Sequence, residues 1–333
     1  MQYKSYQHIE KLGREEVEGI LTGKCYIQPK IDGTNSVLYL GDDGIVHAGS
    51  RKRDLTLTSD NAGFYNSTIR DEKIKKYLNK HPNHYIYCEW LVPHSIKYYD
   101  ATSWQHYYIF DVFEANENYG RYLSYDEYVP LLEEFELTYI PTLAVIDSPT
   151  QEQLIEVMKN NHYLVPEDKI GEGIVIKNYG YKNEYGRTVW AKIIAEEFFD
   201  TKAQLRMKNH AAKDADWEKK VAIMYITEPL VRKEYAKVLN DHPQAQRQEV
   251  IGRVLNSVYD SFIEEDLITV VKVNKNITLN FNLLKSESNK LVKDFELFCF
   301  RIGKNLETYL CMDSRLFLKK LSFVHTILSS SCL

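Results

Sequence analysis

Residues 24–41 read KCYIQPKIDGTNSVLYLG, two apolar runs on either side of a glycine turn. β-branched and aromatic residues favour strands, so the stretch predicts two strands, the first of which ends in Lys30. The second strand runs into GDDG at 41–44, a hairpin-type turn, after which IVHAGSRK returns as a third strand. A lysine becomes a nucleophile when burial or a neighbouring cation favours its neutral amine, and Gly33 leaves room for a ligand. Taken alone, Lys-x-Asp-Gly also fits a solvated lysine and aspartate beside a turn.

The rest of the first two hundred residues alternates between strands and helices. Dense aromatic and β-branched runs predict further strands at 84–92, 106–114, 172–179 and 188–194. Helical spacing predicts helices at 73–81, 124–135 and 150–159. Ser124 and Glu127 form a capping box, and Thr150 caps the third helix. This order predicts an α+β fold of mainly antiparallel sheets with flanking helices.

The composition changes after residue 196, where helix formers with helical spacing replace strand signals. A boundary near Asp200–Asn209 divides the chain into a domain at 1–203 and a smaller, mainly helical domain at 204–333. The stretch at 268–284, ITVVKVNKNITLNFNLL, is ambiguous and could form strands.

The bulk properties exclude some classes of protein. The 333 residues carry a formal net charge of -5, so the whole chain is not a basic nucleic-acid binder, and contacts to a polyanion need local clusters. Five widely spaced cysteines indicate a reduced, intracellular compartment, and we expect a cytoplasmic protein. The polar start is no signal peptide, and no apolar run approaches the ~18 residues that a membrane span needs. We expect a monomer without membrane contact.

Acidic and basic side chains recur inside the apolar strands. Glu89 and the pair Phe110-Asp111 put carboxylates into aromatic strands, where each needs water, a cation or a ligand hydroxyl. In the strand from Glu172 to Lys177, alternation places Glu172 with Ile174 and Ile176, and Lys177 on the opposite face. Lysines on neighbouring strands, beside a carboxylate that binds a metal, suit phosphoryl chemistry. The alternatives are surface acids and an ordinary charged hairpin.

The ordered set of motifs carries more weight than any one of them. K-x-D-G-x-N is followed by S-R, an acidic strand, F-D, E-G-I-V-I-K and a lysine strand. Over roughly residues 24–202 this series resembles the nucleotidyltransferase superfamily of polynucleotide ligases and mRNA capping enzymes. The resemblance implies an adenylyltransferase, ATP-grasp-like domain that takes ATP and Mg²⁺ or Mn²⁺.

The resemblance also implies roles for individual residues. Lys30 matches the nucleophile that forms a phosphoramidate with AMP, and Ile31, Asp32 and Gly33 complete that motif. Asn35 resembles the asparagine that RNA ligases have near the reacting phosphate. The other matched positions are Arg51 (nucleotide or 5′-phosphate), Glu89 (ribose), Phe110 (purine stacking), Glu172 (divalent cation), and Lys177 and Lys192 (α-phosphate).

Two features bear on the subfamily. The last motif in many members reads Lys-x-Lys, whereas Trp190 stands at the first lysine position and leaves Lys192 alone. DNA ligases and capping enzymes continue into a barrel of about five strands, whereas this chain turns helical. Together with Asn35, this favours the RNA ligase 2-like group, which joins RNA 3′-hydroxyl and 5′-phosphate ends. A DNA nick ligase, a GTP-dependent capping enzyme and a non-catalytic nucleic-acid-binding module remain alternatives.

Overall fold

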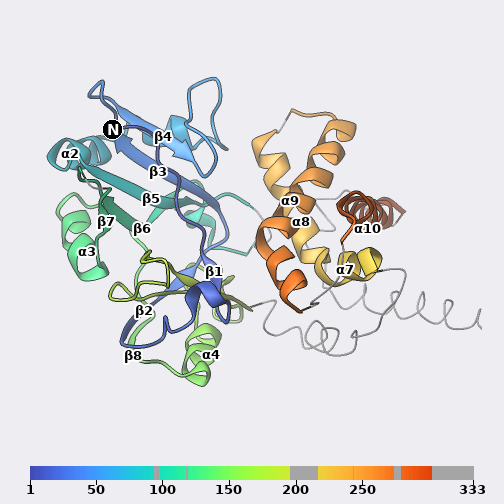
Figure 1. Cartoon of the computed structure of the whole chain (residues 1–333). Helices are drawn as coiled ribbons and strands as arrows, with labels where there is room; N and C mark the ends of the chain where they lie inside the picture. Colours follow the sequence, from blue (N-terminus) through green and yellow to red (C-terminus); the bar gives the residue numbers. More distant parts are fainter. Residues whose placement is uncertain are drawn as a thin grey trace, which may run out of the picture. The chain divides into compact units, whose positions relative to one another are not determined.

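The computed structural model describes residues 1–93, 96, 98–117, 119–195, 217–242, 244–273 and 279–301 (Figure 1). The chain divides into two compact units. The first comprises Met1–Ala211 with Ala236–Ala245, and the second Ala212–Tyr235 with Gln246–Leu333. The boundary expected near Asp200–Asn209 lies outside the described residues, so its position stays a prediction.

One sheet of the first unit carries the strand that ends in Lys30. Neighbouring strands in this sheet pair antiparallel, except for β1 and β10, which run parallel to each other. The order across this sheet, sheet A, is β1 (Glu10–Lys11), β10 (Ala191–Ile194), β9 (Gly173–Lys177), β2 (Lys24–Lys30) and β8 (Ala144–Asp147).

The second sheet begins directly after the glycine turn and is antiparallel throughout. The turn at 41–44 joins its first two strands, as the sequence predicts. The order across this sheet, sheet B, is β4 (Val46–Ser50), β3 (Thr34–Leu40), β5 (His84–Trp90), β6 (Tyr107–Glu114) and β7 (Arg121–Tyr122).

Helices cover the outer face of each sheet, and the α+β prediction is confirmed. Helices α1 (Phe64–Thr68), α2 (Glu72–Lys80) and α3 (Tyr125–Glu134) bury their apolar sides in the core over sheet B. Residues of η1 (Glu15–Val17) and α4 (Gln151–Lys159) do the same over sheet A. Figure 1 shows α2 and α3 beside sheet B, and α4 beside β8.

Side-chain caps define where these helices begin. Asp71 accepts hydrogen bonds from the backbone N–H groups of Lys73 and Ile74 at the start of α2. Capping boxes open α3 at Ser124 and α4 at Thr150, so both predicted caps are confirmed.

The two sheets meet at a cluster made largely of aromatic side chains. It combines sheet B residues such as Tyr87 with Val175 and Trp190 from sheet A, and it includes Tyr6 from the N-terminal segment. The hydroxyls of Tyr85 and Tyr87 donate to backbone carbonyls of that segment, at Gln2 and Lys4. The first residues are therefore part of the layer between the sheets.

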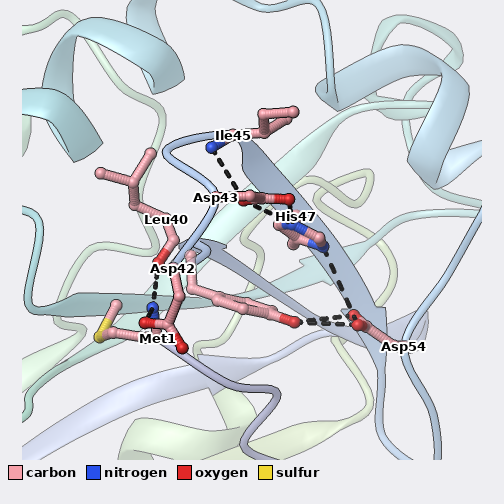
Figure 2. A network of polar contacts seen from close by, with 8 residues as sticks. Met1, Leu40, Asp42, Asp43, Ile45, His47 and Asp54 are labelled. Carbon is pink, nitrogen blue, oxygen red and sulfur yellow. Dashed lines mark hydrogen bonds and ion pairs between the residues drawn. The ribbon is translucent and has the colours of Figure 1, made fainter.

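A polar network fixes the start of this segment at the end of β3. The Met1 amine donates to the Leu40 carbonyl and to Asp42 Oδ1, both at 2.8 Å (Figure 2). On β4, His47 Nε2 lies 3.0 Å from Asp43 Oδ2 and its Nδ1 lies 4.0 Å from Asp54 Oδ2.

The described part of the second unit is helical. It contains α7 (Trp217–Tyr225), α9 (Arg247–Val273), α10 (Phe281–Arg301) and the beginning of α8 (Glu228–Asp241). The sequence left strands possible at 268–284, but residues 268–273 and 281–284 belong to the helices α9 and α10. β-branched residues are tolerated in a helix when packing favours it. Here one buried stripe continues to the end of α9, at Val250, Val254, Val258, Phe262 and Val270.

Among the described residues, no helix is both long and apolar enough to cross a membrane.

Candidate active site

Lys30 and Glu172 form the centre of the candidate site. Lys30 is the last residue of β2, and it pairs with Gly173, the first residue of β9. The Lys30 Nζ lies 2.7 Å from Glu172 Oε2. Their side chains are 19% and 8% exposed, so this ion pair is screened only in part from solvent.

Glu172 does not lie on the face that strand alternation predicts. Ile174 and Ile176 pack in the outer core over sheet A, whereas the Glu172 carboxylate reaches Lys30 on the face toward sheet B. That face also carries Val175, which belongs to the cluster between the sheets. Glu172 stands just before β9, where its carbonyl still accepts from the Ala195 N–H at 2.9 Å, so only its side chain turns toward Lys30.

The turn after Lys30 is held by buried polar contacts. The Asp32 N–H donates to the Tyr99 hydroxyl at 2.7 Å, and Asp32 Oδ2 accepts from the Ile96 N–H at 2.8 Å. Ile31 packs in an apolar cluster with Leu91 and Tyr99. Asp32 thus ties the turn after Lys30 to the loop that follows β5.

The close approach of β5 requires glycine at position 33. A Cβ at this position would lie 2.5 Å from the Trp90 carbonyl oxygen and 2.9 Å from Glu89 Cγ. β5 therefore forbids a side chain at this position, and the approach of a ligand to Gly33 stays a prediction.

Glu89 lies beside the Lys30–Glu172 pair, on sheet B. Its Oε1 accepts a hydrogen bond from the Gly33 N–H at 3.0 Å. Burial raises the pKa of Glu89 to about 7, and the nearby carboxylates of Glu172 and Asp32 add to the rise, whereas Lys30 opposes it. Asn35 pairs with Glu89 across β3 and β5, so both side chains face sheet A.

Arg51 follows β4 at the end of the same sheet. Its guanidinium donates to His8 Nδ1 at 2.8 Å and is exposed to solvent. The β3–β4 register pairs Ser36 with Ser50, so one further step along both strands reaches Asn35 and Arg51. Arg51 therefore lies at the rim of the site, where it can reach a substrate that enters from solvent.

Phe110 occupies a β-bulge in β6. Tyr87 pairs with Asp111 and Cys88 pairs with Ile109, which leaves Phe110 outside the ladder. A bulge of this kind re-aims a side chain and frees backbone groups. The Phe110 ring is half-buried and packs against two core clusters, while its carbonyl accepts from Lys177 Nζ at 2.5 Å and Tyr128 Oη at 3.1 Å.

Lys177 and Asp111 form a fully buried ion pair. Lys177 Nζ lies 2.9 Å from Asp111 Oδ1, with 1% and 0% of the side chains exposed. Burial raises the pKa of Asp111 and lowers that of Lys177, and their contact opposes both shifts. The indole N–H of Trp190 donates to Asp111 Oδ2 at 3.2 Å. Trp190 is itself fully buried, so the residue at the first lysine position of the last motif belongs to the core.

Lys192 stands two residues beyond Trp190 on β10. It pairs with Val175, and Val175 pairs with Gln28 on β2. Directly paired residues share a face of the sheet, so Lys192 projects from the same face of sheet A as Lys30. The Lys192 side chain is partly exposed, in contrast to Lys177.

The residues present suit a divalent cation that is held jointly with a phosphate. Within the described parts of the chain, no group of three or more His, Cys, Asp or Glu side chains could hold a metal ion. Mg²⁺ in phosphoryl-transfer sites needs only one or two carboxylates, since substrate oxygens and water complete the shell. Glu172 is positioned to supply such a carboxylate.

Three contributors to the site escape the sequence motifs. Tyr99 accepts a hydrogen bond from the Asp32 N–H, Tyr6 donates one to Asp111, and Tyr128 donates one to the Phe110 carbonyl. The only signal in the sequence was Asp111, an acid inside an apolar strand, which requires a partner.

The family model for RNA ligase matches residues 23–194, just over half of the chain. The chain belongs to the RNA ligase family. The match contains every residue that the motifs single out, from Lys30 to Lys192. No curated protein matches the sequence.

The chain also has matches among solved structures, all of low sequence identity. A Naegleria gruberi RNA ligase with AMP and Mn is 19% identical, with a TM-score of 0.46 over 58% of this chain and 56% of that one. An archaeal ATP-dependent RNA ligase is 13% identical, with a TM-score of 0.45 over 79% of this chain and 65% of that one. The chain thus matches little more than half the length of the Naegleria protein.

Proposed function

We propose that this RNA ligase uses ATP and a divalent cation to join RNA 3′-hydroxyl and 5′-phosphate ends through a lysyl-AMP on Lys30. The observation that carries the proposal is the grouping of Lys30, Glu172 and Glu89 around one turn, with an amine 2.7 Å from a carboxylate. An amine, a carboxylate able to bind a metal, and a second acid able to bind ribose hydroxyls are the groups that adenylylation needs.

The first chemical step forms the enzyme adduct. Lys30 Nζ, after losing a proton, attacks the α-phosphorus of ATP, a P–N bond forms, and the bond to the β-phosphate oxygen breaks to release pyrophosphate. The contact between Lys30 Nζ and Glu172 Oε2 has to open before the amine can reach the α-phosphorus. A cation held by Glu172 and the phosphates would neutralise charge on the transferring group.

The next two steps consume the adduct. An oxygen of the RNA 5′-phosphate attacks the AMP phosphorus, the P–N bond breaks, and Lys30 regains its proton. The 3′-hydroxyl of the other end then attacks the activated 5′-phosphate, loses its proton and releases AMP. We propose that Lys192 and Asn35 bind phosphate oxygens during these steps, that Phe110 stacks on the adenine, and that Arg51 at the rim meets the 5′-phosphate.

A denaturing gel after incubation with [α-³²P]ATP and Mg²⁺ or Mn²⁺ tests the adduct. The wild type should become labelled, whereas Lys30→Ala and Lys30→Arg should not. Lys30→Arg keeps a cation beside Glu172, but the arginine side chain stays protonated at neutral pH and cannot act as a nucleophile. Lys24→Ala is the matched control, since Lys24 lies on the same strand but is exposed and pairs with Asp126. Undiminished labelling of Lys30→Ala would overturn the assignment of the nucleophile.

Substrate choice separates the remaining alternatives. Labelling by GTP instead of ATP would indicate a capping-type reaction. If neither nucleotide labels the protein, a non-catalytic nucleic-acid-binding module is indicated. Equal sealing of all-DNA nicks would indicate a DNA ligase. We expect ATP labelling and a preference for RNA at the 3′-hydroxyl end.

We further propose that the C-terminal region at 204–333 binds the RNA ends. Lys219 on α7 is an exposed lysine of this region. Lys219→Glu should then slow sealing of RNA more than it slows labelling by ATP, because repulsion from the RNA backbone acts only after the first step. An equal effect on both reactions would count against an RNA-binding role.

A further inference from the structure

The bulge at Phe110 creates a requirement that the rest of the domain has to meet. An unpaired carbonyl inside a protein needs a hydrogen-bond donor, since leaving it unsatisfied is costly. The Phe110 carbonyl finds two donors, Lys177 Nζ and Tyr128 Oη. The lysine is a charged donor, and hydrogen bonds from charged donors are the stronger kind.

Lys177 is held in place by its ion pair with Asp111, the residue that follows Phe110. The two side chains are buried on all sides, and the Nζ reaches both the Asp111 carboxylate and the Phe110 carbonyl. Lys177, which lies on sheet A, therefore contacts two adjacent residues of the bulge in sheet B. Its Nζ also lies 5.5 Å from the centre of the Phe110 ring.

Two further side chains close this cluster around Asp111. The Tyr6 hydroxyl and the Trp190 indole N–H both donate to Asp111 Oδ2. The Tyr6 ring meets the Phe110 ring edge-on, with centroids 4.9 Å apart. The Trp190 ring lies 5.8 Å from Lys177 Nζ. A lysine at position 190, as in the usual Lys-x-Lys motif, would add a second cation beside Lys177.

We infer that Lys177 and Asp111, closed in by Trp190, are positioning residues that set the orientation of Phe110 as the nucleotide-stacking platform. Lys177 then governs how tightly ATP binds, and the chemistry on the α-phosphate is left to Lys30 and Lys192. This inference rests on the proposed adenylylation and departs from the phosphate-binding role that the motif implies for Lys177.

The test measures the KM for ATP and the maximal rate of lysyl-AMP formation separately. Lys177→Met removes the charged donor to the Phe110 carbonyl, and we expect the KM to rise about tenfold or more with the maximal rate nearly unchanged. The double variant Lys177→Met/Asp111→Asn removes both charges, so no lone buried carboxylate remains to unfold the domain. It should show the same rise in KM.

A double-mutant cycle with Phe110→Ala decides whether Lys177 acts through Phe110. If it does, Lys177→Met adds little to the KM of Phe110→Ala, because the platform is already lost. If Lys177 holds a phosphate, the two effects multiply and the maximal rate falls, which would overturn the inference.

Controls separate this outcome from loss of stability and from failure of the proposed function. Leu78→Ala opens a cavity in the core on the outer side of sheet B, so it should lower the melting temperature without raising the KM. A rise in KM for Leu78→Ala equal to that of Lys177→Met would also overturn the inference. If the wild type formed no adduct, the proposed function itself would be contradicted.

Discussion

The Lys30 Nζ and the Glu172 Oε2 lie 2.7 Å apart, so the proposed nucleophile and the proposed metal ligand contact each other directly. The pair joins the end of β2 to the residue before β9, 142 positions along the chain. It keeps both side chains close to the place where the α-phosphate would bind. In the proposed reaction, this contact is exchanged for one from Lys30 to the nucleotide and one from Glu172 to the cation.

Glu172→Gln should therefore depress adenylylation without unfolding the domain. Glutamine can still contact Lys30, but it loses the charge that a cation requires, and we expect labelling to slow by about 10²–10³-fold. The rate of labelling at several Mg²⁺ concentrations measures this. Glu184→Gln, an exposed acid in the connection between β9 and β10, is the matched control and should label normally. Normal labelling by Glu172→Gln would remove the assigned role.

Glu89 should make stability depend on pH. Its pKa is raised to about 7 in the folded state by burial, so ionisation disfavours folding. The penalty is absent below the unfolded pKa of about 4.5, grows as the pH rises toward 7, and is complete above it. Glu89→Gln should thus stabilise the protein at pH 8, by up to about 3 kcal/mol, and change little near pH 5.

Urea unfolding of the wild type and Glu89→Gln at both pH values measures this difference. The variant should also bind ATP more weakly if Glu89 contacts the ribose. A variant no more stable than the wild type at pH 8 contradicts the raised pKa.

Gly33→Ala should destabilise the first unit and abolish labelling. The added Cβ would meet the Trp90 carbonyl at 2.5 Å, so β3 or β5 has to shift, at a cost of about 1–3 kcal/mol. Thermal unfolding and ATP labelling report the two effects. Gly252→Ala is the contrasting control, since its Cβ meets nothing within 4 Å on helix α9. Alanine is the better helix former there by about 1 kcal/mol, so that change should stabilise.

Arg51→Ala should impair sealing more than labelling. Arg51 lies at the rim, on His8, and not against the Lys30–Glu172 pair. We expect about a tenfold slower reaction of the preformed enzyme–AMP with 5′-phosphorylated RNA, the size of one lost charged contact. Lys52→Ala, the exposed neighbour, controls for a general loss of positive charge. Equal losses in both variants would indicate non-specific attraction only.

Much of the fold was readable because it depends on local patterns. The runs around Lys30, Glu89 and Phe110 alternate or are rich in strand formers, and the caps at Ser124 and Thr150 are short-range signals. The ambiguity at 268–284 has the same origin, since valine and isoleucine favour strands locally. In α9 a buried stripe that extends to Val270 outweighs that preference.

The sequence by itself determined the order and identity of the chemical groups, from Lys30 through Glu172 to Lys192, and with them the RNA ligase family. Only the tertiary structure decided what those groups contact. The β-bulge at Phe110 shifts the register by one residue, and it gives Lys177 a carbonyl and a carboxylate as partners in the core. Such pairings join residues far apart in the chain, and their energies depend on burial, which no local pattern of residues contains.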